Sequence, residues 1–99
     1  MQFIQTIEFR TSRYDEVNAL MDQWVASTES THTPTLAYTT RDRDADGDTY
    51  VQVVVFPSYE AAMKNSELPE TGAFAEKMMG LCDGPPTFRN LDVLREEKL

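Results

Sequence analysis

The chain has 99 residues, 40% of them hydrophobic, and its 17 acidic against 9 basic side chains give a formal net charge of −8. This length and composition predict a single domain over residues 1–99. Nucleic acids and anionic membranes are bound through cationic surfaces, so we expect neither as a partner.

The N-terminus and the cysteine content indicate where the protein works. The first residues lack the basic start and apolar core of a signal peptide, and no apolar run approaches the roughly 20 residues of a bilayer span. Cys82 is the single cysteine, which excludes an intrachain disulfide. A free thiol is typical of a reducing compartment, so we predict a cytoplasmic protein. We expect Cys82 to be a small buried hydrophobe and not a nucleophile.

The first third of the chain predicts a strand, a helix and a loop. Residues 3–10 alternate between apolar and polar side chains, which is typical of a strand. Residues 13–27 carry one apolar stripe at helical spacing, with Thr11 and Ser12 as candidate caps. Residues 27–34 are polar and lack periodicity, so they predict a loop.

The middle of the chain predicts a β-hairpin. Residues 36–43 alternate again, and the segment 49–56 is the most β-prone in the chain. Between them, Asp44–Asp48 contains an Asp-Gly pair suited to the positive φ of a hairpin turn.

The last part of the chain predicts a broken helix and a final strand. Ser58 is a good N-cap for a helix that ends near Ser66. Pro69 disfavours helical geometry at Leu68 and then starts a second helical piece over Glu70–Met79. Residues 88–94 predict the fourth strand, and the remaining residues a frayed tail.

The element order strand–helix–strand–strand–helix–strand predicts an α+β ferredoxin-like βαββαβ fold. Such a four-stranded antiparallel sheet carries its helices on one face only. The third strand is nevertheless apolar on both faces: Val51, Val53 and Val55 on one, and Tyr50, Val54 and Phe56 on the other. A second copy of the sheet is the simplest cover for the free face, so we predict a homodimer through that face.

This pattern resembles the dimeric α+β barrel superfamily, and in particular the antibiotic biosynthesis monooxygenase-like domains. The resemblance is most specific in Phe56-Pro57-Ser58-Tyr59-Glu60-Ala61-Ala62-Met63-Lys64-Asn65-Ser66, where a strand ends in an aromatic residue and a helix starts at once. Phe56 stands where the family usually has Trp, and Asn65 where it often has His. The resemblance implies a homodimer with a substrate site between helices and sheet.

A set of aromatic, Met and amide side chains is predicted to converge in that space: Trp24, Tyr38, Met63, Asn65, Phe74 and Met78. They either fill the core or line an apolar pocket with a few polar groups. Asn65 favours the pocket, because a buried amide needs partners. His32, the only histidine, lies in the loop and is a solvated residue or a mobile lid over the pocket.

Other chemical motifs are weak. Asp42–Asp48 imitates the first half of a calcium loop, but Val53 stands where the bidentate Glu belongs and a strand follows, so an acidic hairpin tip is expected. There is no Gly-rich phosphate loop and no nucleophile elbow. We therefore predict no metal and no cofactor.

Two function classes remain open. As a binding protein, the homodimer would take a small apolar or aromatic ligand between helices and sheet, or serve in a larger assembly. As an enzyme, it would be a cofactor-independent monooxygenase-like catalyst of a small aromatic or polyketide-like compound, with Asn65 and Tyr38 holding the substrate's oxygens and Trp24 stacking on its ring. No pair of residues in the sequence has the features of tuned acid/base chemistry.

Overall fold

The computed structural model describes all 99 residues and confirms the ferredoxin-like arrangement. The elements, in chain order, are β1 (Phe3–Arg10), α1 (Tyr14–Ser27), β2 (Leu36–Arg41), β3 (Thr49–Phe56), α2 (Tyr59–Glu67), α3 (Pro69–Leu81) and β4 (Thr87–Asp92). The four strands lie in the order β2-β3-β1-β4, and each neighbouring pair is antiparallel.

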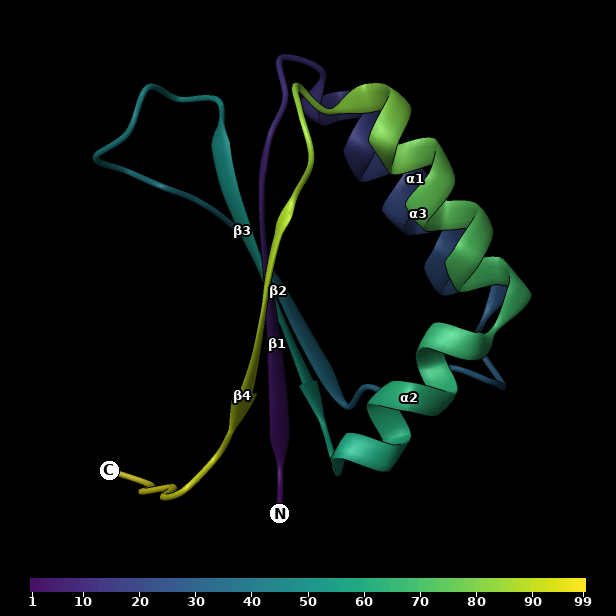
Figure 1. The fold of residues 1–99 in the computed structure, drawn as a ribbon, viewed down its shortest axis with the longest axis vertical. Coiled ribbons are helices and arrows are strands. Elements are labelled where there is room, and N and C mark those ends of the chain that lie inside the picture. The colour runs from purple at the N-terminus through teal and green to yellow at the C-terminus, as the bar shows by residue number, and fades with distance from the viewer.

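The helices form one layer and the sheet another. All three helices lie on the same side of the sheet, which is seen edge-on in Figure 1. The β2–β3 hairpin and the C-terminal tail lean toward the opposite side (Figure 1). No helix covers that opposite side, which we call the uncovered face. No helix has the length and apolar character needed to cross a bilayer.

Pairing between β1 and β3 decides which side chains point at the helices. Phe3 lies opposite Phe56 and Phe9 opposite Tyr50, and all four are buried. Alternation then sends Val51, Val53 and Val55 together to the uncovered face, which confirms the predicted grouping of these side chains.

The buried core consists of two separate apolar clusters. One contains Phe3, Val54, Phe56 and Ala62 and joins the sheet to α2. The other contains Phe9, Val17 and Tyr50 and joins the sheet to α1. In the second cluster the Tyr50 ring stacks between those of Phe9 and Tyr14, at centroid distances of 5.5 and 4.9 Å. Each cluster therefore attaches the helical layer at one end of the sheet.

The predicted break of the second helix is confirmed, and so is its cap. The Ser58 hydroxyl accepts a hydrogen bond from the Ala61 backbone N–H at 3.1 Å. Leu68 is extended (φ −64°, ψ 134°) and separates α2 from α3. The hairpin glycine, Gly47, has φ +92°, as the Asp-Gly pair predicted.

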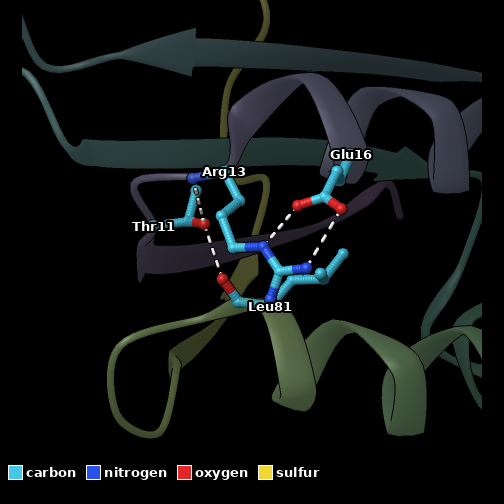
Figure 2. A network of polar contacts seen from close by, with 4 residues as sticks. All are labelled: Thr11, Arg13, Glu16 and Leu81. Carbon is cyan, nitrogen blue, oxygen red and sulfur yellow. Dashed lines mark hydrogen bonds and ion pairs between the residues drawn. The ribbon is translucent and has the colours of Figure 1, made fainter.

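The start of α1 differs from the capping prediction. Arg13 occupies the N-cap without a side-chain cap, and Ser12 makes no capping bond. Instead the buried Thr11 hydroxyl accepts from the Arg13 N–H at 3.0 Å and donates to the Leu81 carbonyl at 2.6 Å (Figure 2). Arg13 in turn pairs with Glu16 one turn into the helix. Thr11 thus ties the start of α1 to the end of α3.

Replacing Thr11 by Val should lower the free energy of unfolding by about 1–3 kcal/mol, because the isosteric side chain leaves the Arg13 N–H and the Leu81 carbonyl unpaired. Urea unfolding followed by circular dichroism measures the change. Thr31→Val, at an exposed loop threonine whose side chain makes no hydrogen bond, is the matched control and should stay within about 0.5 kcal/mol of the parent. Equal effects of the two substitutions would contradict the role of Thr11.

Candidate functional site

A diagonal of polar side chains crosses the helix-facing side of the sheet. Asn90 lies opposite Gln5, and Thr39 lies opposite Gln52. Gln5 and Gln52 are diagonal neighbours on the two central strands, about 7–8 Å apart, which long amide side chains can span. We call Thr39, Gln52, Gln5 and Asn90 the polar row.

The polar row crosses the helix-facing side of the sheet between the two apolar clusters, and its end residues Thr39 and Asn90 are exposed. The Thr39 hydroxyl is 3.4 Å from the Met21 sulfur of α1, which places this end of the row under that helix. At the other end the Gln5 amide donates to the Asn90 carbonyl oxygen at 3.2 Å. Gln52 makes no side-chain hydrogen bond in the chain, and its side chain is partly exposed. The centre of the covered face therefore combines two amides with Val54 and Ile7, and Gln52 is partly exposed to solvent.

Two predicted pocket residues, Trp24 on α1 and Phe74 on α3, lie together beside His32, the predicted lid. The Trp24 ring lies 6.0 Å from that of His32 and 6.5 Å from that of Phe74, measured between centroids. Its indole N–H donates to the Thr71 hydroxyl at 3.0 Å, so the ring is held in place from α3. His32 is exposed on the loop that follows α1. This group combines a fixed aromatic ring with an imidazole open to solvent.

Asn65 is buried and holds the loop after α1. Its side-chain oxygen accepts from the Thr33 backbone N–H at 3.4 Å, and the Thr33 hydroxyl bonds the Ala61 carbonyl of the same helix. The loop and the α2–α3 break consequently lie at the same end of the molecule. The amide that the sequence suggested for a ligand is thus engaged with the backbone beside His32.

The remaining predicted pocket residues are dispersed. Met78 packs against the cluster of Phe9, Val17 and Tyr50, and Met63 lies on α2 with 39% of its surface exposed. Tyr38 does not join the pocket, because it lies on the uncovered face and is 54% exposed. Its neighbour Thr39 faces the helices instead, since side chains alternate along a strand.

A groove also runs between α1 and α3. Two adjoining cavities, of about 540 and 230 Å³, share the side chains of Leu20, Gln23 and Lys77. Trp24 and Phe74 line the smaller one, which places their outer edges in the groove. Arg13 and Glu16 line the larger one and pair with each other. Neither cavity includes a residue of the polar row or Asn65.

The acidic hairpin uses its carboxylates to shape the turn. Asp42 accepts from the Asp44 N–H and Asp46 from the Asp48 N–H, at 3.0 and 3.1 Å. Asp46 also pairs with Arg10, which lowers the pKa of that carboxyl. The structure brings together no three His, Cys, Asp or Glu side chains able to hold a metal ion. This segment is the hairpin tip that the sequence predicted.

Sequence reasoning did not identify the polar row. The run Gln52-Val53-Val54 contains only one polar residue, and the strand pattern hides which of its two faces the helices cover. A usable signal was present: Gln5 and Gln52 both share the alternation phase of the aromatic residues in their strands. Two amides in phase with Phe3, Phe9 and Phe56 predict a polar interruption in the core.

The fold of this chain is shared with solved structures of antibiotic biosynthesis monooxygenase-like domains. Rv0793 from Mycobacterium tuberculosis superimposes with a TM-score of 0.80 at 17% identity over 99% of this chain and 100% of that one. SnoaB, a cofactor-independent oxygenase from Streptomyces nogalater, gives 0.80 at 14% identity over 96% and 95%. A protein described as an antibiotic biosynthesis monooxygenase gives 0.74 at 14% identity over 96% and 100%. No protein-family model and no curated protein matches the chain.

Cys82 lies against the apolar cluster of Phe9, Val17 and Tyr50. Burial raises the pKa of its thiol, and the charge of Asp83 raises it further. Fewer thiolates are therefore present at neutral pH than for a cysteine in water, and the thiolate is the nucleophilic form.

Alkylation of Cys82 by iodoacetamide should be slower in the folded protein than in the same chain unfolded in urea, at any pH near neutrality. Because folding raises the pKa of the Cys82 thiol, the alkylation rate of the folded protein should keep rising with pH after that of the unfolded chain has levelled. Mass spectrometry over a pH series gives both rates. A folded chain that reacts as fast as the unfolded one would show that the thiol is activated.

Proposed function

We propose that the protein binds a small aromatic compound carrying hydroxyl or carbonyl oxygens, between the helices and the sheet, and that it works as a homodimer. The observation that carries the ligand proposal is the polar row. An amide on the covered face of a sheet needs hydrogen-bond partners where it is shielded from water. Here Gln52 makes none within the chain, and so remains free to bind a ligand.

The surroundings of the polar row suit an aromatic ligand. Ligand sites are mostly apolar, with few polar groups that orient the ligand. Trp24 and Met21 lie on the helix that covers the row, and Ile7 lies opposite Gln52 in the sheet. The ring of the ligand would pack on these side chains, and Gln52 and Gln5 would bind its oxygens.

His32 is our candidate for the lid. It is exposed, its ring lies 6.0 Å from that of Trp24, and its loop is anchored next to it through Thr33. Such an arrangement lets the imidazole move while the base of the loop stays in place. A bound ring beside Trp24 would be covered by this motion.

Homodimerisation is supported by the uncovered face. Leu36, Tyr38 and Leu91 expose 49%, 54% and 44% of their surface there. They surround the half-buried Val53 and Val55 of the central strand β3. Contiguous exposed apolar surface of this kind marks an interaction site, and a symmetric pair is the commonest way to cover it.

Catalysis is the second candidate. SnoaB, which shares the fold, is described as a cofactor-independent oxygenase. His32 is the only histidine of the chain and its ring lies beside that of Trp24, so it is the residue to test as a proton acceptor. Uptake of dioxygen by a bound phenolic compound would favour catalysis, and binding without uptake would favour the ligand-binding function.

We also propose a cytoplasmic location, because the single cysteine of the chain is typical of a reducing compartment.

Hydroxylated naphthalenes and anthraquinones should raise the melting temperature, and the tightest of them should quench the fluorescence of Trp24, the only tryptophan. Gln52→Leu should weaken that compound's binding about tenfold through the lost hydrogen bond. His32→Ala should also weaken binding, with stability within about 0.5 kcal/mol of the parent.

The matched control is Gln23→Leu, which makes the same change on the outer surface of α1 and lines the groove between α1 and α3. It should leave binding unchanged. A loss of binding in Gln23→Leu, with none in Gln52→Leu, would move the ligand to that groove.

The parent protein should sediment at twice its chain mass of 11.3 kDa. Val53→Asp should give a folded monomer, because a carboxylate at the centre of the uncovered face cannot be buried without a partner. Ala75→Asp, at an exposed position on α3, is the control and should stay dimeric. A parent protein that sediments as a monomer at micromolar concentration would contradict the homodimer.

A further inference from the structure

The uncovered face has a graded composition along its strands. The strand register places its side chains in three rows, each crossing β2, β3, β1 and β4 in that order: Leu36, Val55, Ile4 and Leu91; then Tyr38, Val53, Thr6 and Arg89; then Thr40, Val51, Glu8 and Thr87. The first row is entirely apolar, the second is mixed and the third is mostly polar.

This gradient restricts how two copies can pack. In a two-fold pair each patch meets its own copy, and the direction of the axis decides which rows meet. An axis across the strands reverses the rows, so the apolar first row would lie on the mostly polar third row of the partner. An axis along the strands keeps every row opposite itself, so the first row packs apolar on apolar, and Glu8 and the partner's Val51 meet at the polar end of the face. The gradient therefore favours the second arrangement, and aligned sheets, whose strands differ by about 30°, preserve it.

An axis along the strands also exchanges the two sides of the sheet. The edge strand β2 of one copy then lies over the edge strand β4 of the other. In the first row this brings Leu36 onto the partner's Leu91. In the second row it brings Tyr38 onto the partner's Arg89.

Tyr38 and Arg89 have no such partners within one chain. They lie on opposite edges of the sheet, three strand spacings or about 14 Å apart. Tyr38 is 54% exposed, and Arg89 takes part in none of the ion pairs of the chain. A guanidinium stacks favourably on a tyrosine ring, more so when water is excluded.

We propose that the uncovered face binds a second copy of this chain about a two-fold axis running along the strands, with Tyr38 of each protomer stacked on Arg89 of the partner subunit. The proposal rests on the proposed homodimer and adds its orientation and its specific contact. It gives Tyr38, which the structure removes from the ligand pocket, a role as an interface residue.

Opposite charges at position 38 test the contact. Tyr38→Glu would meet the partner's Arg89 as an ion pair, whereas Tyr38→Lys would meet it as a like charge. Tyr38→Glu should therefore dimerise more tightly than Tyr38→Lys, with dissociation constants about fivefold or more apart. Adding Arg89→Glu to each should reverse the order. Dissociation constants come from sedimentation velocity over a concentration series at one ionic strength.

The overall charge of the chain predicts the opposite order. With a net charge of −8, any added Lys lowers the repulsion between two copies and any added Glu raises it. Ala75→Glu and Ala75→Lys, on the exposed side of α3, measure this general effect in both backgrounds. There Lys should dimerise at least as tightly as Glu, whatever the residue at 89.

Each outcome of this test is informative. Reversal of the order at position 38, without reversal at position 75, supports the contact. A dimeric parent that Val53→Asp dissociates, but with no reversal at position 38, overturns the axis and the Tyr38 contact while leaving the homodimer. A monomeric parent overturns both and assigns the uncovered face to a different protein. Melting curves of all variants show that each is folded.

Discussion

Antiparallel pairing of β1 with β3 is the constraint on which the rest of the molecule depends. Because Phe3 faces Phe56 and Phe9 faces Tyr50, the two central strands present the same phase of their alternation to the helices. This phase decides which face of the sheet each of the remaining strand side chains points to. Gln52 is turned inward under the helices and Val53 outward, and a shift of one residue would exchange the two faces.

The helical layer is attached mainly at its two ends. Phe56 and Ala62 hold α2 over one end of the sheet, and Val17 packs on Phe9 at the other. At that second end Thr11 joins the start of α1 to the end of α3 through two hydrogen bonds (Figure 2). Firm attachment at both ends allows the middle of the covered face to carry polar side chains without loss of the fold. The polar side chains between the clusters and the small size of the buried core therefore have the same physical origin.

Both sheet faces depart from the simplest α+β pattern. The covered face carries Gln5 and Gln52 at its centre, beside Val54 and Ile7, and the uncovered face is apolar along β3 and at one end. The reverse distribution would be more stable for a monomer in water, because polar groups gain from hydration and apolar groups gain from burial. The inversion is physically consistent if a ligand occupies the first face and a second copy the other.

Prediction from the sequence succeeded where the signal is local. Alternation, helical periodicity, the cap at Ser58 and the break at Leu68 are all set within a few residues, and each appears in the structure. The sequence left both Thr11 and Ser12 as candidate caps of α1, and the structure selects Thr11, which also bonds to Leu81, seventy residues further along the chain. The predicted pocket was partly dispersed because whether Tyr38 or Thr39 faces the helices depends on pairing with β3.

The sequence by itself therefore determined the order of the elements, the ferredoxin-like class and the two-sided apolar character of β3. Only the tertiary structure decided that Gln5 and Gln52 share a diagonal under the helices, that Asn65 holds the loop beside His32, and that Tyr38 belongs to the uncovered face. The physical reason is that periodicity determines which residues share a face of the sheet, whereas strand register and helix placement determine which of the two faces the helices cover.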